Sequence, residues 1–120
     1  MIDLQRRRVR VSGVDMSFIE EGDPENPAVV FLHGFPTSSF LWREFVPLFA
    51  PWTHVLAPDL LGCGDSGSPE EAELHIRAQA GYLREFLAGL GVDRFAVVGH
   101  HTGAVIATEI AAAYPQRVEA

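Results

Sequence analysis

The residues with the clearest chemical meaning form a short segment, Gly99 to Gly103, between an apolar run and an alanine-rich run. The segment reads Gly-His-His-Thr-Gly, which is the pattern G-x-nucleophile-x-G with His101 at its centre. A sharp turn from a buried strand into a helix pushes the central side chain out at the end of the sheet, and flanking glycines leave room for it. The pattern is typical of a nucleophile elbow and makes His101 the first candidate catalytic residue.

A second segment, HGFPTSSFLW, follows the apolar run Ala28–Leu32 and begins at His33. We expect it to leave a buried strand and to lead into an amphipathic helix. Ser38 and Ser39 are suited to cap the first turn of that helix, because a serine hydroxyl accepts a hydrogen bond from a free amide there. Trp42 is expected in the core or in the wall of a pocket.

The elements that must position these segments alternate between strands and helices. Extended stretches at Arg6–Val11 and Asp15–Glu21 predict an antiparallel hairpin. Three apolar runs predict strands covered on both faces, as in a parallel sheet; they are Ala28–Leu32, His54–Ala57 and Phe95–Val98. Helices are predicted over Ile76–Leu90, from apolar residues at helical spacing, and over Thr102–Ala113. The sequence therefore predicts an α/β fold, with a mostly parallel twisted sheet, an N-terminal hairpin and helices on both faces.

Composition narrows the classes of function. The chain has 120 residues, of which 48% are hydrophobic, so it can form a globular core. Sixteen acidic against nine basic residues give a net charge of -7, which argues against a nucleic acid or an anionic membrane as partner. No run approaches the roughly 20 apolar residues of a membrane span. The first residues lack the apolar run of a signal peptide, so we expect a cytoplasmic protein.

The motifs HGFPTSSFLW, APDLLGCGDSG and VVGHHTG occur in this order, and an alanine-rich helix and YPQRV follow the last one. In this order and spacing they resemble the N-terminal half of an α/β-hydrolase, in the branch of haloalkane dehalogenases and epoxide hydrolases. The resemblance covers nearly the whole chain and implies one partial domain over residues 1–120. It implies a hydrolase that cleaves an ester, an epoxide or a carbon-halogen bond of a small organic substrate through a covalent intermediate.

The resemblance also implies roles for individual residues. The backbone amides of Phe35 and Thr102 would form the oxyanion hole, in which two donors stabilise the developing negative charge. His101 would occupy the position of the nucleophile. The peptide bond between Phe35 and Pro36 would be cis, which proline makes inexpensive.

Other conspicuous residues are interpreted as structural. By the same resemblance, Asp59 and Ser66 would hold a loop, and His100 would pack inside the protein. Cys63 has no positively charged neighbour in its glycine-rich loop, so we expect an inert thiol. The histidines and the cysteine show no zinc-binding pattern, and neither a metal nor a cofactor is expected.

The chain departs from the family pattern at the positions that matter most for the chemistry. The family has serine, aspartate or occasionally cysteine at the elbow, where this chain has His101. Histidine can act as a nucleophile, but no residue identifiable in the sequence orients its ring, so a lost or repurposed nucleophile is a competing interpretation. Dehalogenases would have asparagine in place of Phe35 and tryptophan in place of Thr102 to hold halide, so halide release is not expected.

The family order places the acid and the histidine of the catalytic triad after later strands, beyond Ala120. We therefore expect the 120-residue chain alone to show negligible turnover of activated esters or epoxides. The strand Phe95–Val98 is expected to keep an unpaired apolar edge, through which the chain would self-associate. The alternative is a truncated, non-catalytic or interaction-only protein of the same fold.

A remote alternative is a dinucleotide-binding domain, because GCGDSG at Gly62–Gly67 matches the pattern G-x-G-x-x-G. In that fold the third glycine opens the helix that receives the pyrophosphate. Here Ser68-Pro69 intervenes, and three glutamates crowd the position of the expected phosphate; they are Glu70, Glu71 and Glu73.

Overall fold

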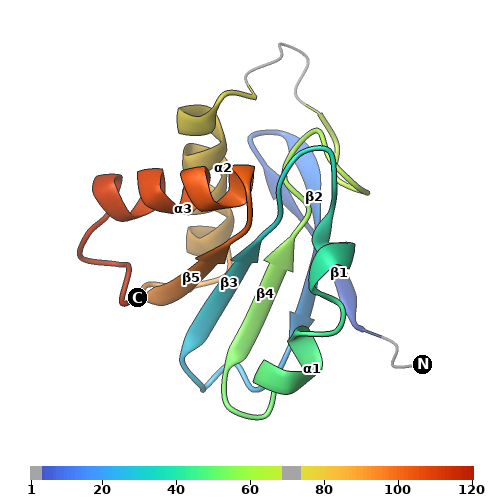
Figure 1. Cartoon of the computed structure of the whole chain (residues 1–120), viewed down its shortest axis with the longest axis vertical. Coiled ribbons are helices and arrows are strands. Elements are labelled where there is room, and N and C mark those ends of the chain that lie inside the picture. Colours follow the sequence, from blue (N-terminus) through green and yellow to red (C-terminus); the bar gives the residue numbers. More distant parts are fainter. Residues whose placement is uncertain (1–3, 69–73) are drawn as a thin grey trace.

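A five-stranded sheet and the helices that cover it position the candidate residues (Figure 1). The computed structural model describes residues 4–68 and 74–120. The strands are β1 (Arg6–Val11), β2 (Val14–Glu21), β3 (Ala28–Leu32), β4 (His54–Pro58) and β5 (Phe95–Gly99). The helical elements are the 3₁₀ turn η1 (Ser39–Trp42) and the α-helices α1 (Val46–Phe49), α2 (Ile76–Gly89) and α3 (Thr102–Ala113). The strands and the two long helices lie within one residue of their predicted bounds.

The strands are arranged in the order β1-β2-β4-β3-β5. The hairpin partner β2 pairs antiparallel with both β1 and β4, whereas β3 pairs parallel with β4 on one side and with β5 on the other. The predicted hairpin and the predicted block of parallel strands are therefore confirmed. Because β3, β4 and β5 run parallel, the loops that follow these strands all leave the sheet at its carboxyl end.

Successive side chains of the central strands enter two different cores. Phe31 packs with Trp42 and Val46 on one face of the sheet. Val30 and Leu32 join a larger core on the other face, together with residues of α2 and α3. Figure 1 shows α2 and α3 on one side of the sheet and α1 on the other, so the prediction of helices on both faces is confirmed.

The segment after β3 differs from the single amphipathic helix that we expected. It divides into η1 and α1, because Pro47 lacks an amide and fits only in the first turn of a helix. Ser38 caps η1 as predicted, since its hydroxyl accepts a hydrogen bond from the amide of Phe40 at 3.2 Å. Ser39, the other predicted cap, is fully buried and does not cap η1. Trp42 lies in the core, as expected.

The expectation of an unpaired edge at β5 is wrong for the first half of the strand. Residues 117–120 lie alongside β5, and the amide of Phe95 donates to the carbonyl of Arg117 at 2.9 Å. The amide of Val97 donates to the carbonyl of Ala120 at the same distance. The reason is the turn after α3, which brings the chain back along the strand. Self-association through the remaining part of this edge, near the half-exposed Val98, stays a prediction.

None of the helices within residues 4–68 and 74–120 is long and apolar enough to cross a membrane.

The larger core gives a direct test of this packing. The ring of Phe86 is fully buried and meets the ring of Phe18 edge to face, with centroids 4.9 Å apart. We expect Phe86→Ala to lower the free energy of unfolding in urea by about 3–5 kcal/mol, because it removes buried apolar area and leaves a cavity. The control Val105→Ala, at a side chain that is 53% exposed, should change it by less than about 0.5 kcal/mol. Equal effects of the two substitutions would contradict the assigned core.

Candidate active site

The turn from β5 into α3 has the backbone of a strained elbow. His101 has φ 59° and ψ -121°, a combination that residues with a Cβ atom rarely adopt. The flanking glycines are required by space, because a Cβ atom on Gly99 would collide with the backbone of Gly103 and Ala104. A Cβ atom on Gly103 would collide with the carbonyl of Leu32 at the end of β3. The predicted elbow is therefore confirmed, and it packs directly against the neighbouring strand.

The loop after β3 lies against the elbow. The amide of His100 donates to the carbonyl of Leu32 at 3.0 Å. A Cβ atom placed on Gly34 would lie 2.9 Å from the Cβ atom of His101 and 3.2 Å from the amide nitrogen of Thr102. The structure therefore brings the Phe35 loop, His101 and the start of α3 together, as the sequence motifs predict. The peptide bond between Phe35 and Pro36 is cis, as predicted.

Two backbone amides at this junction have no acceptor. Within the described part of the chain, neither the amide of Phe35 nor that of Thr102 donates a hydrogen bond. The amide of Thr102 is free because this residue opens α3, where the first amides have no partner inside the helix. Free backbone donors beside an elbow are what an oxyanion site needs.

The side chain of His101 is exposed and has one partner among the described residues. Its Nδ1 atom lies 3.2 Å from Oγ1 of Thr102. No carboxylate of the described residues forms an ion pair with it, so none of them orients this ring as the acid of a catalytic triad would. The ring of His100 lies 6.4 Å away, centroid to centroid, and is exposed as well, which corrects the expectation that His100 packs inside the protein.

A buried histidine that the sequence reasoning did not single out connects two of the loops. His33 is fully buried at the end of β3. Its Nε2 atom accepts a hydrogen bond from the amide of Leu60 at 2.9 Å, and Nδ1 lies 2.8 Å from the carbonyl of Gly34. Burial lowers the pKa of His33, against the opposing effects of the Gly34 hydrogen bond and of Asp59, and keeps the ring neutral. Its position directly before Gly34, after a buried strand, was the available signal.

Asp59 holds the loop after β4, as expected from the resemblance. Its Oδ1 atom accepts from the amide of Ser39 at 2.8 Å, and its Oδ2 atom accepts from the amide of Asp65 at 2.9 Å. Oδ2 also lies 3.3 Å from the guanidinium of Arg6. Ser66 fixes the same loop by donating from its hydroxyl to the carbonyl of Asp59 at 2.6 Å. The buried carboxylate thus joins the segment after β3 to the loop after β4.

The other candidates have structural environments. Burial raises the pKa of the Cys63 thiol to about 11, with the charge of Asp59 acting in the same direction, so this thiol is inert at neutral pH. Gly67 does not open a helix, because its amide and carbonyl bond to Asp15 and Gly62, and α2 begins at Ile76. The three glutamates weighed against a dinucleotide site lie outside the described residues. Within residues 4–68 and 74–120, no three metal-ligating side chains are grouped to hold an ion.

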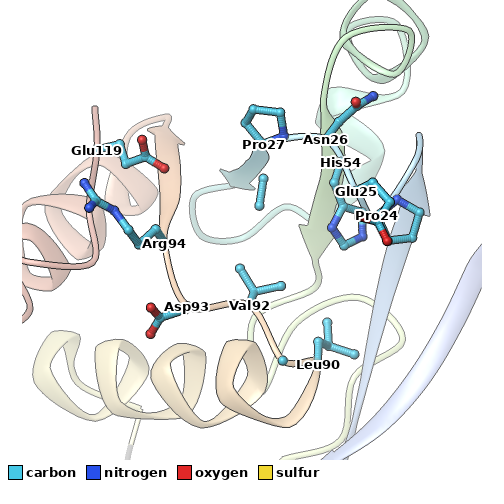
Figure 2. A pocket seen from close by; sticks show the side chains of 12 residues that line it. Pro24, Glu25, Asn26, Pro27, His54, Leu90, Val92, Asp93, Arg94 and Glu119 are labelled. Carbon is cyan, nitrogen blue, oxygen red and sulfur yellow. The ribbon is translucent and has the colours of Figure 1, made fainter.

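A cavity of about 410 Å³ lies at the opposite end of the parallel strands (Figure 2). It is bordered by the segments that enter β3 and β5, by His54 at the start of β4 and by Glu119. Ligands of open α/β sheets bind outside the carboxyl ends of the strands, which is where the elbow lies. The cavity is therefore not part of the candidate active site.

Comparison with known proteins agrees with this geometry. The family described as alpha/beta hydrolase fold matches residues 27–120. A haloalkane dehalogenase of Bradyrhizobium diazoefficiens is 40% identical over 120 residues, which are 98% of this chain and 37% of that protein. Epoxide hydrolase A of Mycobacterium tuberculosis is 37% identical over 116 residues, which are 95% of this chain and 36% of that protein. The crystal structure of a membrane phospholipase A superimposes with a TM-score of 0.93 at 33% identity, over 96% of this chain and 37% of that chain.

The fold and the elbow define a hydrolase core of the α/β class. The chain belongs to the α/β-hydrolase family, and its relatives include haloalkane dehalogenases and epoxide hydrolases. It spans little more than a third of the length of the relatives it matches.

The strain at the elbow can be measured. We expect His101→Gly to raise the free energy of unfolding by about 1 kcal/mol, because glycine adopts a positive φ without steric cost and the exposed imidazole loses few contacts. Ala104→Gly, inside α3, is the matched control and should lower it by about 1 kcal/mol. Urea unfolding measures both. A loss of stability in His101→Gly would show that the elbow is not strained.

The Asp59 contacts predict a dependence of stability on pH. Burial alone would raise the pKa of Asp59, but hydrogen bonds from Ser39 and Asp65 and the charge of Arg6 outweigh it and lower the pKa. The native state then binds fewer protons than the unfolded state, so the contribution is complete above about pH 4 and is lost as the pH falls through the lowered native pKa.

Asp59→Asn should therefore cost about 2 kcal/mol near pH 7 and progressively less at acidic pH, where the wild-type carboxylate is protonated too. Thermal or urea unfolding across this pH range measures the difference. Asp65→Asn changes an exposed carboxylate in the same loop and should cost less than about 0.5 kcal/mol. A cost for Asp59→Asn that stays constant with pH would contradict the assigned role of the carboxylate charge.

Proposed function

We propose that the protein is a hydrolase of small organic substrates and that the junction of β3, β5 and α3 is its active site. The observation that carries this proposal is the strained elbow at His101, beside two backbone amides that have no acceptor in the described part of the chain. Strain in a backbone is stored where the surrounding structure enforces it, and such positions cluster at active sites. Here the amides of Phe35 and Thr102 would hold the substrate oxygen that becomes negative in the transition state.

The residues at the site favour an ester or an epoxide over a carbon-halogen bond. Phe35 and Thr102 stand where a dehalogenase would carry the asparagine and tryptophan side chains that hold halide. Neither phenylalanine nor threonine has an amide or indole N–H in its side chain to replace them. Their backbone amides remain, and these donors suit the oxygen of a carbonyl or an alkoxide.

The 120-residue chain alone should turn over slowly. An ordinary elbow reaction needs a carboxylate and a histidine that activate the nucleophile and then water. Among the described residues, the His101 side chain has a hydrogen-bond partner only in the hydroxyl of Thr102, and no carboxylate forms an ion pair with either His100 or His101. The same observation favours the second candidate, a non-catalytic protein of this fold that keeps the oxygen-binding site without chemistry.

The oxygen site can be tested without turnover. We expect phenylphosphonate, which presents tetrahedral anionic oxygens, to shift the backbone amide NMR signals of Phe35 and Thr102 saturably at millimolar concentration. Benzyl alcohol has the same ring without the anionic oxygens and is the matched control, with little effect expected. Shifts confined to residues around the cavity of Figure 2, such as His54, would place binding elsewhere and overturn the proposal.

Turnover is measured in parallel. The chain should release less than about one product molecule per chain per minute from p-nitrophenyl acetate or styrene oxide, because general acid-base catalysis, worth roughly 10²–10⁴-fold, is missing. Sustained, saturable turnover that survives in the chain alone would show that the described residues suffice for catalysis.

A further inference from the structure

We propose that His101 is itself a nucleophile and that its Nε2 atom accepts the acyl group of an activated ester. The protein would then take up one acyl group per chain and release it slowly. This inference rests on the proposed function, because it uses the same pair of backbone amides. It goes further in naming the attacking atom, the covalent product and the substrate class.

The contacts of the His101 ring leave one nitrogen for attack. Nδ1 lies 3.2 Å from Oγ1 of Thr102, within reach of a hydrogen bond. When Nδ1–H donates to this hydroxyl, the lone pair of the neutral ring is on Nε2. Nε2 has no partner among the described residues, and the side chain is exposed, so an ester can reach it.

The backbone explains why His101 should react and its neighbour should not. The positive φ of His101 places its Cβ atom against the loop that contains Phe35, since a Cβ atom on Gly34 would lie only 2.9 Å from it. The attacked carbonyl would then lie beside the free amides of Phe35 and Thr102. His100 is exposed too, but it precedes the central residue of the elbow and does not have a positive φ. The chain therefore contains its own control imidazole.

The proposed step balances without a further reactant. The Nε2 lone pair forms a bond to the carbonyl carbon of an aryl ester, and the two amides stabilise the oxyanion. The carbon-oxygen bond to the leaving group breaks, and the phenolate departs with the electron pair. The acyl-imidazolium then loses its Nδ1 proton to water and becomes a neutral acyl-imidazole. Water later hydrolyses it to the carboxylic acid and restores the imidazole.

Because no described residue acts as a base at the site, each chain should react with one ester molecule. Release of the acyl group needs an activated water molecule, and no carboxylate–histidine pair among the described residues lies at the elbow to supply one. Acylation of His101 should therefore be faster than hydrolysis of the acyl group. The result is a burst of one leaving group per chain, followed by slow hydrolysis, which is consistent with the negligible turnover expected of this chain.

The composition makes the acyl acceptor easy to identify. The sequence contains no lysine, so no side-chain amine competes for the acyl group. The only cysteine, Cys63, is buried and its pKa is raised to about 11, which keeps it in the unreactive thiol form. The remaining competitors are the N-terminal amine, the other histidines and the hydroxyls of the two tyrosines.

The experiment treats the chain with p-nitrophenyl acetate at pH 8 and follows nitrophenolate release by stopped flow. Peptide mass spectrometry of the rapidly quenched wild-type chain locates the acetyl group. We expect it on His101, at one per chain. His101→Gln should slow the burst at least tenfold, since it removes the attacking nitrogen and an amide side chain is not a comparable nucleophile. His100→Gln should leave the burst rate within about twofold, and amide NMR spectra confirm that both variants are folded.

The outcomes separate this inference from the proposed function. Acetylation spread over His100, His101 and the N-terminus, or a burst unchanged in His101→Gln, would overturn the nucleophile assignment. If phenylphosphonate shifts the Phe35 and Thr102 amides but no acetyl group appears on His101, the oxygen site stands and the nucleophile is wrong. If neither occurs, both proposals fail.

Discussion

The close packing of the elbow against the end of β3 is the constraint on which the rest of the site depends. Gly103 lies so near the carbonyl of Leu32 that no side chain fits between them, and the amide of His100 bonds to the same carbonyl. This contact fixes the start of α3 relative to the Phe35 loop. Buried polar contacts extend it to the third loop, because His33 binds the amide of Leu60 and Asp59 binds that of Ser39. The loops are held by neutral or fully partnered groups, which suits a site built from backbone atoms.

Much of this arrangement could be predicted from the sequence, for identifiable physical reasons. Fully apolar runs predicted the parallel strands, and apolar spacing predicted α2 within one residue of its observed end. The elbow followed from two glycines around His101, because glycine is required where backbones meet closely. Parallel pairing also predicted that the motifs around Phe35 and His101 lie side by side, since the loops that follow parallel strands leave the sheet at the same end.

The errors have both local and long-range physical causes. Pro47 is compatible with a helix only in its first turn, so the predicted amphipathic helix became η1 and α1. The pairing of residues 117–120 with β5 depends on a turn whose direction the composition of the segment does not reveal. His33 was missed because a single histidine after a strand has no distinctive spacing, and its importance comes from partners in a loop 27 residues away.

The identity of the elbow residue and the existence of the oxygen site are physically separable. The proposed donors at Phe35 and Thr102 are backbone amides, so their presence depends on the glycines and on the start of α3, not on the side chain at position 101. A histidine at this position would therefore change the attacking atom without removing the donors. Attack by an imidazole nitrogen on an ester would leave the carbonyl oxygen of the acyl group beside the same amides, as attack by another elbow nucleophile on that ester would. A change of nucleophile would consequently be compatible with an unchanged fold, and we expect its main effect on how the covalent intermediate is released.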